Sequence, residues 1–551
     1  MYTAPLADYR LLLPLLGMDV LRAHHPDVTP DTEEAILTEA ARLSETVLAP
    51  LNRNGDLHPA RLENGVVRCS PGFAEGFRAI AGGGWIGMAA RPENGGMGLP
   101  MVLASCVNEM MGSACLALQL NPLLTQGQIE ALEHHADPAM QALYLPRLIS
   151  GEWNGTMNLT EPQAGSDVGA LRARAEPLGD GTYAVTGEKI FISWADSDFM
   201  ANTCHLVLAR LPDAGEGTKG ISLFMVPKHL PNPDGTLGAR NAVKVVRLEH
   251  KLGLHGSPTA VMAFDGAKGW LVGAPHKGMA AMFTMMNNAR LGVGLQGVSA
   301  AEAAFQQALA YANERRQGKT ATGEATIIGH PDVRRMLTEM RAETFAARAI
   351  CLACAIAIDM GRADGDMTRA AFLTPISKAY GTDTGHHVAQ LGVQVHGGMG
   401  FIEDTGAAQH ARDVRVTSIY EGTNGIQSLD LVFRKMMDDG ATAFALIDEM
   451  EAANTHPDLA PLLSPALKAL RAGTQTLLAQ SALDRSAAAV AYQRAFAQVL
   501  GAHYHVQAAK ADPTRLPLAR FALTRLLPRH AAFLAEAAHG AEGLFGGAFS
   551  A

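Results

Sequence analysis

The sequence predicts a mainly helical protein with a small β domain in the middle of the chain. Apolar residues recur at helical spacing in both end regions, whereas residues 156–273 hold short apolar runs bounded by turns. A dinucleotide-binding fold is not expected, because strands and helices do not alternate and no GxGxxG follows a strand. At 551 residues and 48% hydrophobic composition, the chain can build several cores. We expect an N-terminal helical domain over 1–155, a barrel-like β domain over 156–273, a four-helix bundle over 274–438 and a helical extension over 439–551.

The N-terminal region carries a predicted helical run from Asp31 to Leu51 with an acidic first turn, and a second from Met101 to His135. Gly-rich loops separate the two runs. The first residues show neither a basic n-region nor a cleavage site, and the apolar run Leu11–Leu16 is interrupted by Pro14. We therefore expect a cytoplasmic protein with no membrane span.

The middle region is predicted to form one compact antiparallel sheet. Ile190–Ser193, His205–Ala209 and Ile221–Val226 are short, apolar and bounded by turn residues. Residues 181–187 are expected to form a turn, a short strand and a second turn.

The third region is predicted to be helical again. Met279–Arg316 contains no proline, and Pro331 can occupy the first turn of the next helix. A further helix is expected to end at Gly392, followed by a Gly-rich turn at 397–400. The last core helix is expected from about Gly425 to Met437.

Charge and cysteine content exclude several classes of protein. The formal net charge of −9 makes general nucleic-acid binding improbable on electrostatic grounds. Six scattered cysteines do not form a disulfide framework. Cys351 and Cys354 make a single CxxC in an apolar run, so we interpret them as core thiols and expect no metal site.

Four short motifs carry possible chemistry. Residues 157–167 (MNLTEPQAGSD) and 394–400 (QVHGGMG) place hydroxyls and glycines where backbone N–H groups can approach an anion or a ring edge. In 187–193 (GEKIFIS), an aromatic and a hydroxyl end a strand. In 419–425 (IYEGTNG), Glu421 lies between an aromatic and a glycine, which suits a partly desolvated general base. Taken singly, each motif also fits an ordinary turn, strand or surface glutamate.

Together, these motifs resemble those of the acyl-CoA dehydrogenases. The similar stretches are MNLTEPQAGSD, GEKIFIS, YANERRQGK, GVQVHGGMGF and RDVRVTSIYEGTNGIQ, in the family's order, within residues 30–438. The resemblance implies non-covalent FAD and oxidation of an acyl-CoA thioester to the trans-2-enoyl-CoA. It also implies electron-transfer flavoprotein or a similar acceptor as partner, and a homodimer.

The resemblance also implies which residues contact the cofactor. One group follows the strands of the β domain, and a second reaches the FAD diphosphate of a neighbouring subunit. Thr423 matches a contact to the adenosine part. The first group is Met157, Leu159, Thr160, Ser166, Phe191, Ile192 and Ser193, and the second is Arg315, Gln394, Gly397 and Gly398.

By the same resemblance, Glu421 is the base that removes the Cα proton. Its backbone N–H and a ribityl hydroxyl of the cofactor would hold the thioester oxygen. Ser166, Arg290 and Gly422 match positions at the acyl-CoA site. Some members carry the base just before the residue that matches Arg290, but here that position is Ala289, which cannot act as a base.

The chain departs from the family pattern at Pro331, Gly425 and Gln317, which affects expected adenosine and interface contacts. YTAPLADYR, HPDVRRML and the extension are similar to a subgroup that includes enzymes acting on 3-methylthiopropanoyl-CoA. Medium- and long-chain acyl-CoA dehydrogenase, acyl-CoA oxidase and an inactive member remain alternatives. A flavin-bearing DNA-binding relative is a fourth, although residues 441–551 hold nine basic and eight acidic residues.

Overall fold

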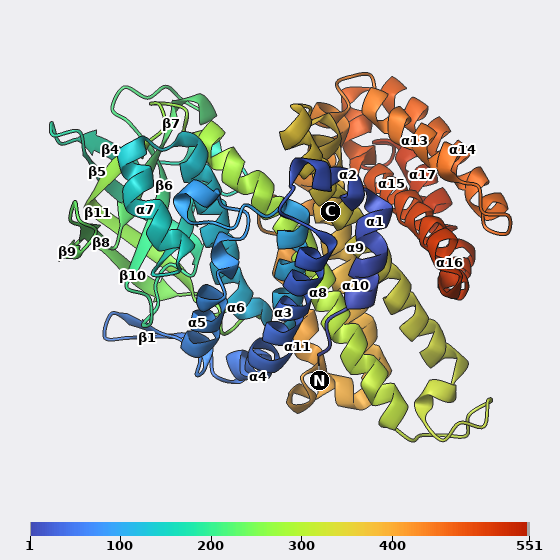
Figure 1. Ribbon diagram of the computed structural model, residues 1–551. Helices are drawn as coiled ribbons and strands as arrows, with labels where there is room; N and C mark the ends of the chain where they lie inside the picture. Colours follow the sequence, from blue (N-terminus) through green and yellow to red (C-terminus); the bar gives the residue numbers. More distant parts are fainter. Residues whose placement is uncertain (1, 548–551) are drawn as a thin grey trace. The chain divides into compact units, whose positions relative to one another are not determined.

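The structure is a computed structural model that describes residues 2–547, apart from the side chains at positions 287 and 288 (Figure 1). The chain divides into two compact units. Unit 1 comprises Met1–Ala41, Met101–Ser113 and Arg290–Ala551, and unit 2 comprises Arg42–Pro100 and Ala114–Ala289. The strands belong to unit 2, and the described part of unit 1 is helical, so the predicted fold class is confirmed.

The main sheet of unit 2 has seven strands in the order β10-β11-β5-β4-β6-β3. The remaining strand, β7, pairs with both β6 and β11, and this pairing closes the sheet into a barrel-like ring. Alternate side chains of these strands fill an apolar core that includes Val185, Val207 and Phe224. The strands are β3 (Trp153–Asn158), β4 (Arg174–Pro177), β5 (Tyr183–Ser193), β6 (Asn202–Arg210), β7 (Ile221–Pro227), β10 (Val243–Leu248) and β11 (Thr259–Val272).

Three expectations for the strands were wrong. The sheet is mixed, because β3 runs parallel to β6 from Trp153↔Asn202 onward. Gly187 lies inside β5 with φ +154°, where the strand is continuous instead of ending in a turn. The N-terminal region also contains a hairpin, β1 (Arg61–Glu63) and β2 (Val66–Arg68), where only helices were expected. A second short pair is β8 (His229–Pro231) and β9 (Leu237–Arg240).

Helices complete unit 2 and are positioned by local sequence signals. The side chain of Asp137 accepts a hydrogen bond from the Met140 N–H at 2.9 Å, and Pro138 occupies the first position of α7. Helices α6 and α8 are each shared between the units, and the backbone of α6 leaves helical geometry at Cys115. The helices are α4 (Ala49–Leu57), α5 (Phe73–Gly82), α6 (Met101–His135), α7 (Pro138–Ile149) and α8 (Gly278–Glu314).

Unit 1 is built around long helices, among them α9 (Pro331–Asp364) and α10 (Thr368–His396). Pro331 starts α9 as predicted, and Gly365 ends it with φ +82°. Gly392 does not end the next helix, because α10 continues to His396 with Gly392 buried in its interior. The core helices are α1 (Leu6–Leu16), α2 (Met18–Leu21), α3 (Pro30–Leu43), α9 (Pro331–Asp364), α10 (Thr368–His396), α11 (Ala407–Val414) and α12 (Asn424–Leu429).

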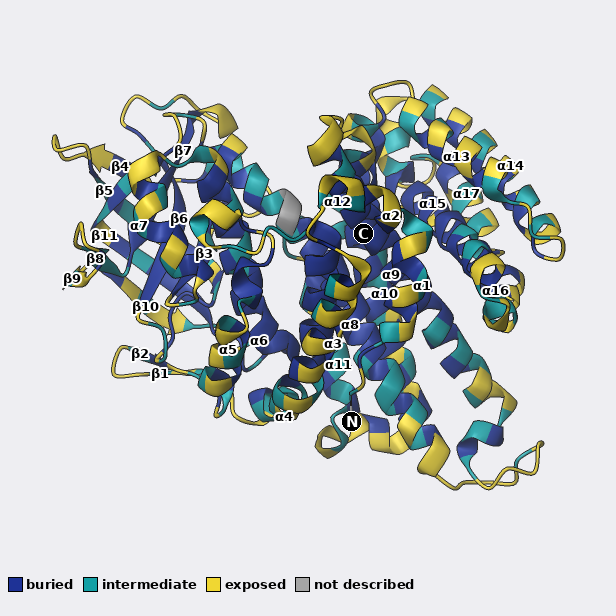
Figure 2. Ribbon diagram, in the orientation of Figure 1, coloured by how far each residue is buried: buried dark blue, intermediate teal, exposed yellow. Residues whose placement is uncertain are grey.

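The C-terminal extension belongs to unit 1 and is helical, as predicted. Figure 2 shows its long helix α15 largely buried, with exposed residues on the helices around it. Ser481 caps α15 by accepting a hydrogen bond from the Asp484 N–H. The helices are α13 (Ala441–Ala453), α14 (Ala460–Ala479), α15 (Ala482–Ala511), α16 (Leu516–Phe521) and α17 (Arg529–His539).

Helices α8 and α10 approach each other closely at four glycines. A Cβ on Gly294 would lie 2.7 Å from the carbonyl oxygen of Ser377, and Gly297, Gly381 and Gly385 leave still less room. Only glycine allows backbones to come this close. The contact fixes the spacing between the parts of α8 and α10 that carry site residues.

Two helices, α6 and α9, are long and apolar enough to cross a membrane by length and composition alone. We did not expect either helix to span a membrane, because neither contains about 18 consecutive apolar residues. Their most apolar windows are 100% and 94% buried. Such burial is typical of core helices in a large domain.

Candidate active site

The loop after α11 carries Glu421 in a left-handed conformation. Its φ is +55°, and that of Gly422 is +83°. The side chain of Gln427 donates a hydrogen bond to the Glu421 carbonyl oxygen at 3.2 Å. The Thr423 hydroxyl accepts one from the Ile426 N–H at 3.3 Å and thereby caps α12. A non-glycine residue held at positive φ marks a backbone that its surroundings keep strained, which is common at active sites.

The charge of Glu421 is set by burial and two cations. Burial raises the pKa of its carboxyl above the usual range, while the positive charges of Arg290 and Lys378 lower it. Tyr420 precedes it, and the Tyr420 hydroxyl donates to the side-chain oxygen of Gln296. A carboxyl with a raised pKa can accept a proton near working pH, as general-base catalysis requires.

Arg290 and Lys378 come from neighbouring helices. Arg290 is buried on α8 with its guanidinium 3.8 Å from the Asp430 carboxylate, and burial lowers its pKa. Lys378 is fully buried on α10, and its ammonium donates to the Asn424 side-chain oxygen at 2.9 Å. Burial lowers the pKa of Lys378 to about 8. The structure thus brings Glu421 and Arg290 together, and adds Lys378, which the motifs did not single out.

The first group of predicted cofactor contacts comes together in unit 2. The Ile190 N–H donates to the Thr160 carbonyl oxygen at 2.9 Å, so the segment after β3 lies beside the end of β5. Met157, Leu159 and Thr160 are half-buried. Phe191 has φ +61°, and its side chain is 60% exposed.

Ile192 and Ser193 complete the end of β5. Ile192 is buried and Ser193 is half-buried, and both pair with β11. An exposed aromatic ring, a hydroxyl and the backbone after β3 therefore share one surface. This donor set fits a planar ring system with a polar edge, so the residues present fit the flavin of FAD.

Two residues missed by the sequence interpretation hold this surface in place. The buried ammonium of Lys189 donates to the Leu159 carbonyl oxygen at 3.0 Å and pairs with the Glu161 carboxylate at 2.8 Å. Glu161 also accepts from the N–H groups of Arg172 and Ala173 at 2.6 and 3.0 Å. Both residues stand inside the quoted motifs, so a glutamate in one motif and a lysine in the other were the available signal.

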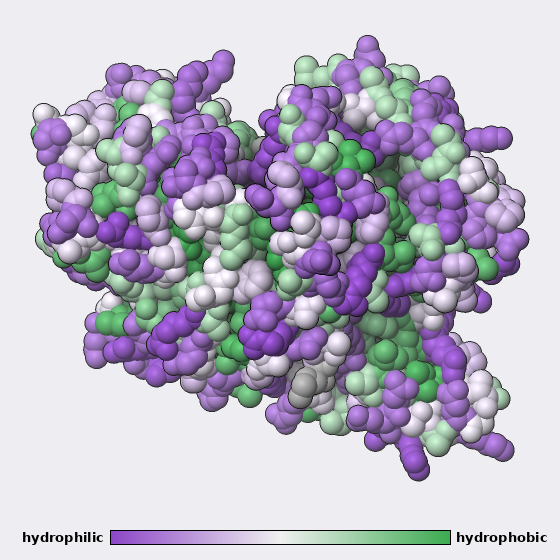
Figure 3. Space-filling model, viewed as in Figure 1, coloured by the Kyte–Doolittle hydropathy of each residue, from purple (hydrophilic) through white to green (hydrophobic). Residues whose placement is uncertain are grey.

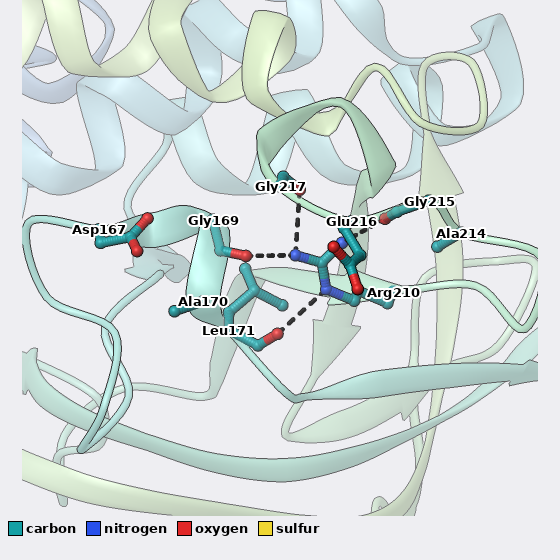
Figure 4. A pocket seen from close by; sticks show the side chains of 9 residues that line it. All are labelled: Asp167, Gly169, Ala170, Leu171, Arg210, Ala214, Gly215, Glu216 and Gly217. Atoms are coloured by element: carbon teal, nitrogen blue, oxygen red, sulfur yellow. Dashed lines mark hydrogen bonds between the residues drawn. The ribbon is translucent and has the colours of Figure 1, made fainter.

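Ser166 is exposed and directly precedes Asp167, one of the residues that line a pocket. Figure 4 shows this pocket and the Arg210 side chain within it. In this pocket the Arg210 guanidinium donates hydrogen bonds to the backbone carbonyl oxygens of Leu171 at 3.1 Å, Gly215 at 2.8 Å and Gly217 at 3.0 Å. Arg210 thus fixes the chain that follows Ser166. The pocket is lined by Asp167, Gly169, Ala170, Leu171, Arg210, Ala214, Gly215, Glu216 and Gly217.

The second group of predicted contacts lies where α8 and α10 end in unit 1. The rings of Tyr311 and His396 stack with centroids 4.4 Å apart, which places Arg315 near the Gly-rich turn. Arg315, Gln394, Gly397 and Gly398 are all exposed, and Gly397 has φ +60°. Exposed residues of this kind are available to a group outside their own subunit.

Family models match most of the chain. The N-terminal domain of acyl-CoA dehydrogenases matches residues 30–152, the middle domain matches 156–267, and the C-terminal domain matches 276–436. Over 506 residues, the chain is 44% identical to 3-methylmercaptopropionyl-CoA dehydrogenase of Ruegeria pomeroyi, which covers 88% of this chain and 86% of that protein.

Two solved structures share the fold. One is ACDH-11 of Caenorhabditis elegans in complex with C11-CoA, with a TM-score of 0.77 and 21% identity over 93% of this chain and 90% of that one. The other is an acyl-CoA dehydrogenase of Bacillus anthracis complexed with FAD, with a TM-score of 0.77 and 19% identity over 93% and 88%. This chain belongs to the acyl-CoA dehydrogenase family, an FAD-dependent family of oxidoreductases that act on acyl-CoA thioesters.

Proposed function

We propose that this FAD-dependent acyl-CoA dehydrogenase acts on 3-methylthiopropanoyl-CoA, with Glu421 as its catalytic base. The observation that carries the role of Glu421 is its position on a strained loop, with its pKa raised by burial and moderated by Arg290 and Lys378. The proposed substrate is supported by the 44% sequence identity, over 88% of this chain, to 3-methylmercaptopropionyl-CoA dehydrogenase. 3-Methylmercaptopropionyl-CoA and 3-methylthiopropanoyl-CoA are two names for the same thioester.

In the proposed reaction, the Glu421 carboxylate removes the proton from Cα of the thioester. The Glu421 backbone N–H donates to the thioester oxygen, where negative charge develops as the proton leaves. FAD, when bound, supplies the acceptor for the hydride from Cβ. Arg290 keeps a positive charge beside the carboxylate, and the product is the trans-2-enoyl-CoA.

Methionines of α8 are a possible lining for a thioether chain, because sulfur makes favourable dispersion contacts. Met282 and Met285 are buried in the protein core, which supports a packing role for these two. Met279 and Met286 are half-buried and remain candidates for the acyl pocket.

We also propose a homodimer that passes electrons to electron-transfer flavoprotein or a similar acceptor. The exposed second group of cofactor contacts supports a dimer, since those side chains face outward from their own unit. Beside them, Phe401 is 86% exposed, and Met399 and Ile402 are also exposed. A cytoplasmic location is part of this proposal and is supported by the lack of disulfide bonds among the described cysteines.

The experiment is a comparison of kcat/KM for 3-methylthiopropanoyl-CoA with straight-chain acyl-CoAs from C4 to C16. We expect the thioether substrate and C4 to C6 chains to be preferred, within about 1–3 kcal/mol of one another, because a thioether and a methylene are similar in size. Anaerobic bleaching of the bound flavin by each substrate provides an independent reading. An optimum at C12 or longer would instead identify a long-chain acyl-CoA dehydrogenase.

A further inference from the structure

A polar cluster around the buried side chain of Lys378 connects the Glu421 loop to the C-terminal extension. The Lys378 cluster consists of Lys378 and Asp383 on α10 and Asn424, the first residue of α12. All three belong to unit 1 together with Glu421 and the extension.

Hydrogen bonds tie the cluster to the start of α12. Asn424 accepts from the Lys378 ammonium at 2.9 Å, and its amide nitrogen donates to the Asp383 carboxylate at 2.7 Å. The same nitrogen lies 3.0 Å from the Thr382 hydroxyl. Asn424 follows Glu421 by three residues, so its side chain anchors one end of the loop that carries the carboxylate.

The extension holds the cluster from the other side. Arg494 of α15 pairs with the second oxygen of the Asp383 carboxylate at 3.1 Å. The neighbouring Gln493 is buried, donates to the Pro375 carbonyl oxygen and accepts from the Ser428 hydroxyl. Neighbouring residues of α15 therefore contact both α10 and α12. These are the two helices that the Lys378–Asn424 hydrogen bond joins.

Charge gives the cluster a further role. Lys378 is fully buried and interacts electrostatically with Glu421 and Asp383, which favour its charged form, and with Arg290, which opposes it. Burying an ammonium is costly unless nearby negative charge compensates for it. The carboxylates of Glu421 and Asp383 supply that compensation, so the charges of Lys378 and Glu421 support each other.

We propose that Lys378 is a positioning residue for the catalytic base, and that Asn424, Asp383 and Arg494 of the extension hold it there. Lys378 keeps Glu421 ionised, and Asn424 keeps the loop in register with α10. The C-terminal extension is then a working part of the active site in addition to a packing layer. This inference rests on the proposed role of Glu421.

The charged groups around Glu421 and Lys378 determine which pKa a kcat/KM profile against pH reports. Arg290 faces Glu421 from α8, and Lys378 faces it from α10. Asp430 and Arg434 follow α12 and act on Glu421 through Arg290. Because Lys378 favours the carboxylate, its removal is expected to raise the pKa of Glu421 and to move the acidic limb of the kcat/KM profile to higher pH.

The central test compares Lys378→Met with Lys378→Arg, both purified with FAD and matched to wild type in flavin absorbance. We expect K378M to move the acidic limb upward by about one pH unit, the effect of one nearby opposite charge, and K378R to restore it. Glu421→Gln is measured in parallel. If the acidic limb of K378M stays at the wild-type pH while E421Q is inactive, the inference about Lys378 is overturned. If E421Q is active, Glu421 itself is not the base.

Two further variants test whether the extension holds the Glu421 loop through Arg494 and Asn424, and they remain informative if K378M does not fold. Arg494→Ala and Asn424→Ala are each expected to lower kcat by about threefold to tenfold with little change in KM, because misplacing a reacting group slows chemistry more than binding. Arg471→Ala is the matched control, since Arg471 is an arginine of the extension whose ion pairs are with Asp448 and Glu451. Equal kcat values for R494A and R471A, or an N424A enzyme with wild-type kcat, contradict the proposal that Arg494 and Asn424 hold the Glu421 loop in place.

Discussion

Opposing effects act on the single carboxyl of Glu421. Removal from water favours its neutral form, and the charges of Arg290 and Lys378 favour its anion. The balance leaves the pKa above that of an ordinary glutamate, which makes the anion a stronger base than a solvated carboxylate. The left-handed backbone at Glu421 stores about 1–3 kcal/mol of strain, which Gln427 and the capped start of α12 hold in place.

Replacing Glu421 by glutamine is expected to keep the fold and the bound FAD and to lower kcat by about 10²- to 10⁴-fold, because the amide cannot accept a proton. The measurements are steady-state kinetics, flavin content and the thermal midpoint. Glu75→Gln, at an exposed carboxylate of unit 2, is the control and should match wild type. Activity of E421Q within about threefold of wild type, or about 0.7 kcal/mol in barrier, would remove Glu421 as the base.

At the level of helices and strands, local signals predicted element types better than their ends and partners. Pro331 and the β-rich middle region were predicted correctly because turn and periodicity signals are local. The parallel pairing of β3 with β6 was missed, since side-chain alternation is the same in parallel and antiparallel strands. Gly392 was interpreted as a helix end, yet it lies buried inside α10, where a Cβ would make only ordinary contacts, 3.5 Å and more from Ala304 and Met340.

For the site, the motif residues were predictable, but the groups that hold them were not. Glu421 and Phe191 were identified from their motifs, and both have positive φ. Lys378 lies on the buried face of α10, and its hydrogen-bond partner Asn424 lies 46 positions away in the sequence. A lysine on an apolar helix face signals a buried charge, but only the fold shows which carboxylate compensates for it.

The crossing of α8 and α10 makes a prediction for Gly381. Its Cβ would fall against the carbonyl of Gly294, so Gly381→Ala must separate helices that carry Arg290 and Lys378. We expect a loss of about 1–3 kcal/mol in the free energy of unfolding and a lower kcat, as for overpacked cores. Denaturant unfolding measures the first effect. Gly82→Ala on α5, where a Cβ has open space, is the control, and equal stability of the two variants would show that the helices can adjust.

Within unit 1, one buried charge cluster joins distant parts of the chain. Arg348 of α9 is fully buried and pairs with Asp8 at 2.7 Å, Glu109 at 2.7 Å and Glu302 at 2.6 Å. Arg515 of the extension reaches the same Asp8 at 2.8 Å. Removing one partner from such a cluster typically costs about 3–5 kcal/mol. The extension therefore contributes to the core of unit 1. Figure 3 shows hydrophilic and apolar residues intermixed on the visible face of the protein.

Assembly of the whole molecule follows from the exposed apolar turn at the end of α10. Phe401, at 86% exposure, follows Gly397 and Gly398, and Met399 and Ile402 beside it are 44% and 46% exposed. Adjacent exposed apolar side chains of this kind mark an interaction surface. The neighbouring Arg315 and Gln394 are the residues that the family resemblance assigns to a partner's cofactor.

Phe401→Asp is therefore expected to convert the proposed dimer into a monomer and to reduce FAD content, since a charge in a buried interface is unfavourable and the cofactor contacts leave with the partner. Multi-angle light scattering gives the mass, and released FAD is measured after denaturation. Leu483→Asp is the control because Leu483 is also exposed, at 56%, but lies on the extension. We expect L483D to keep the dimer mass. A tetramer in wild type would contradict the proposed homodimer, and an F401D protein that stays dimeric with full FAD would place the interface elsewhere.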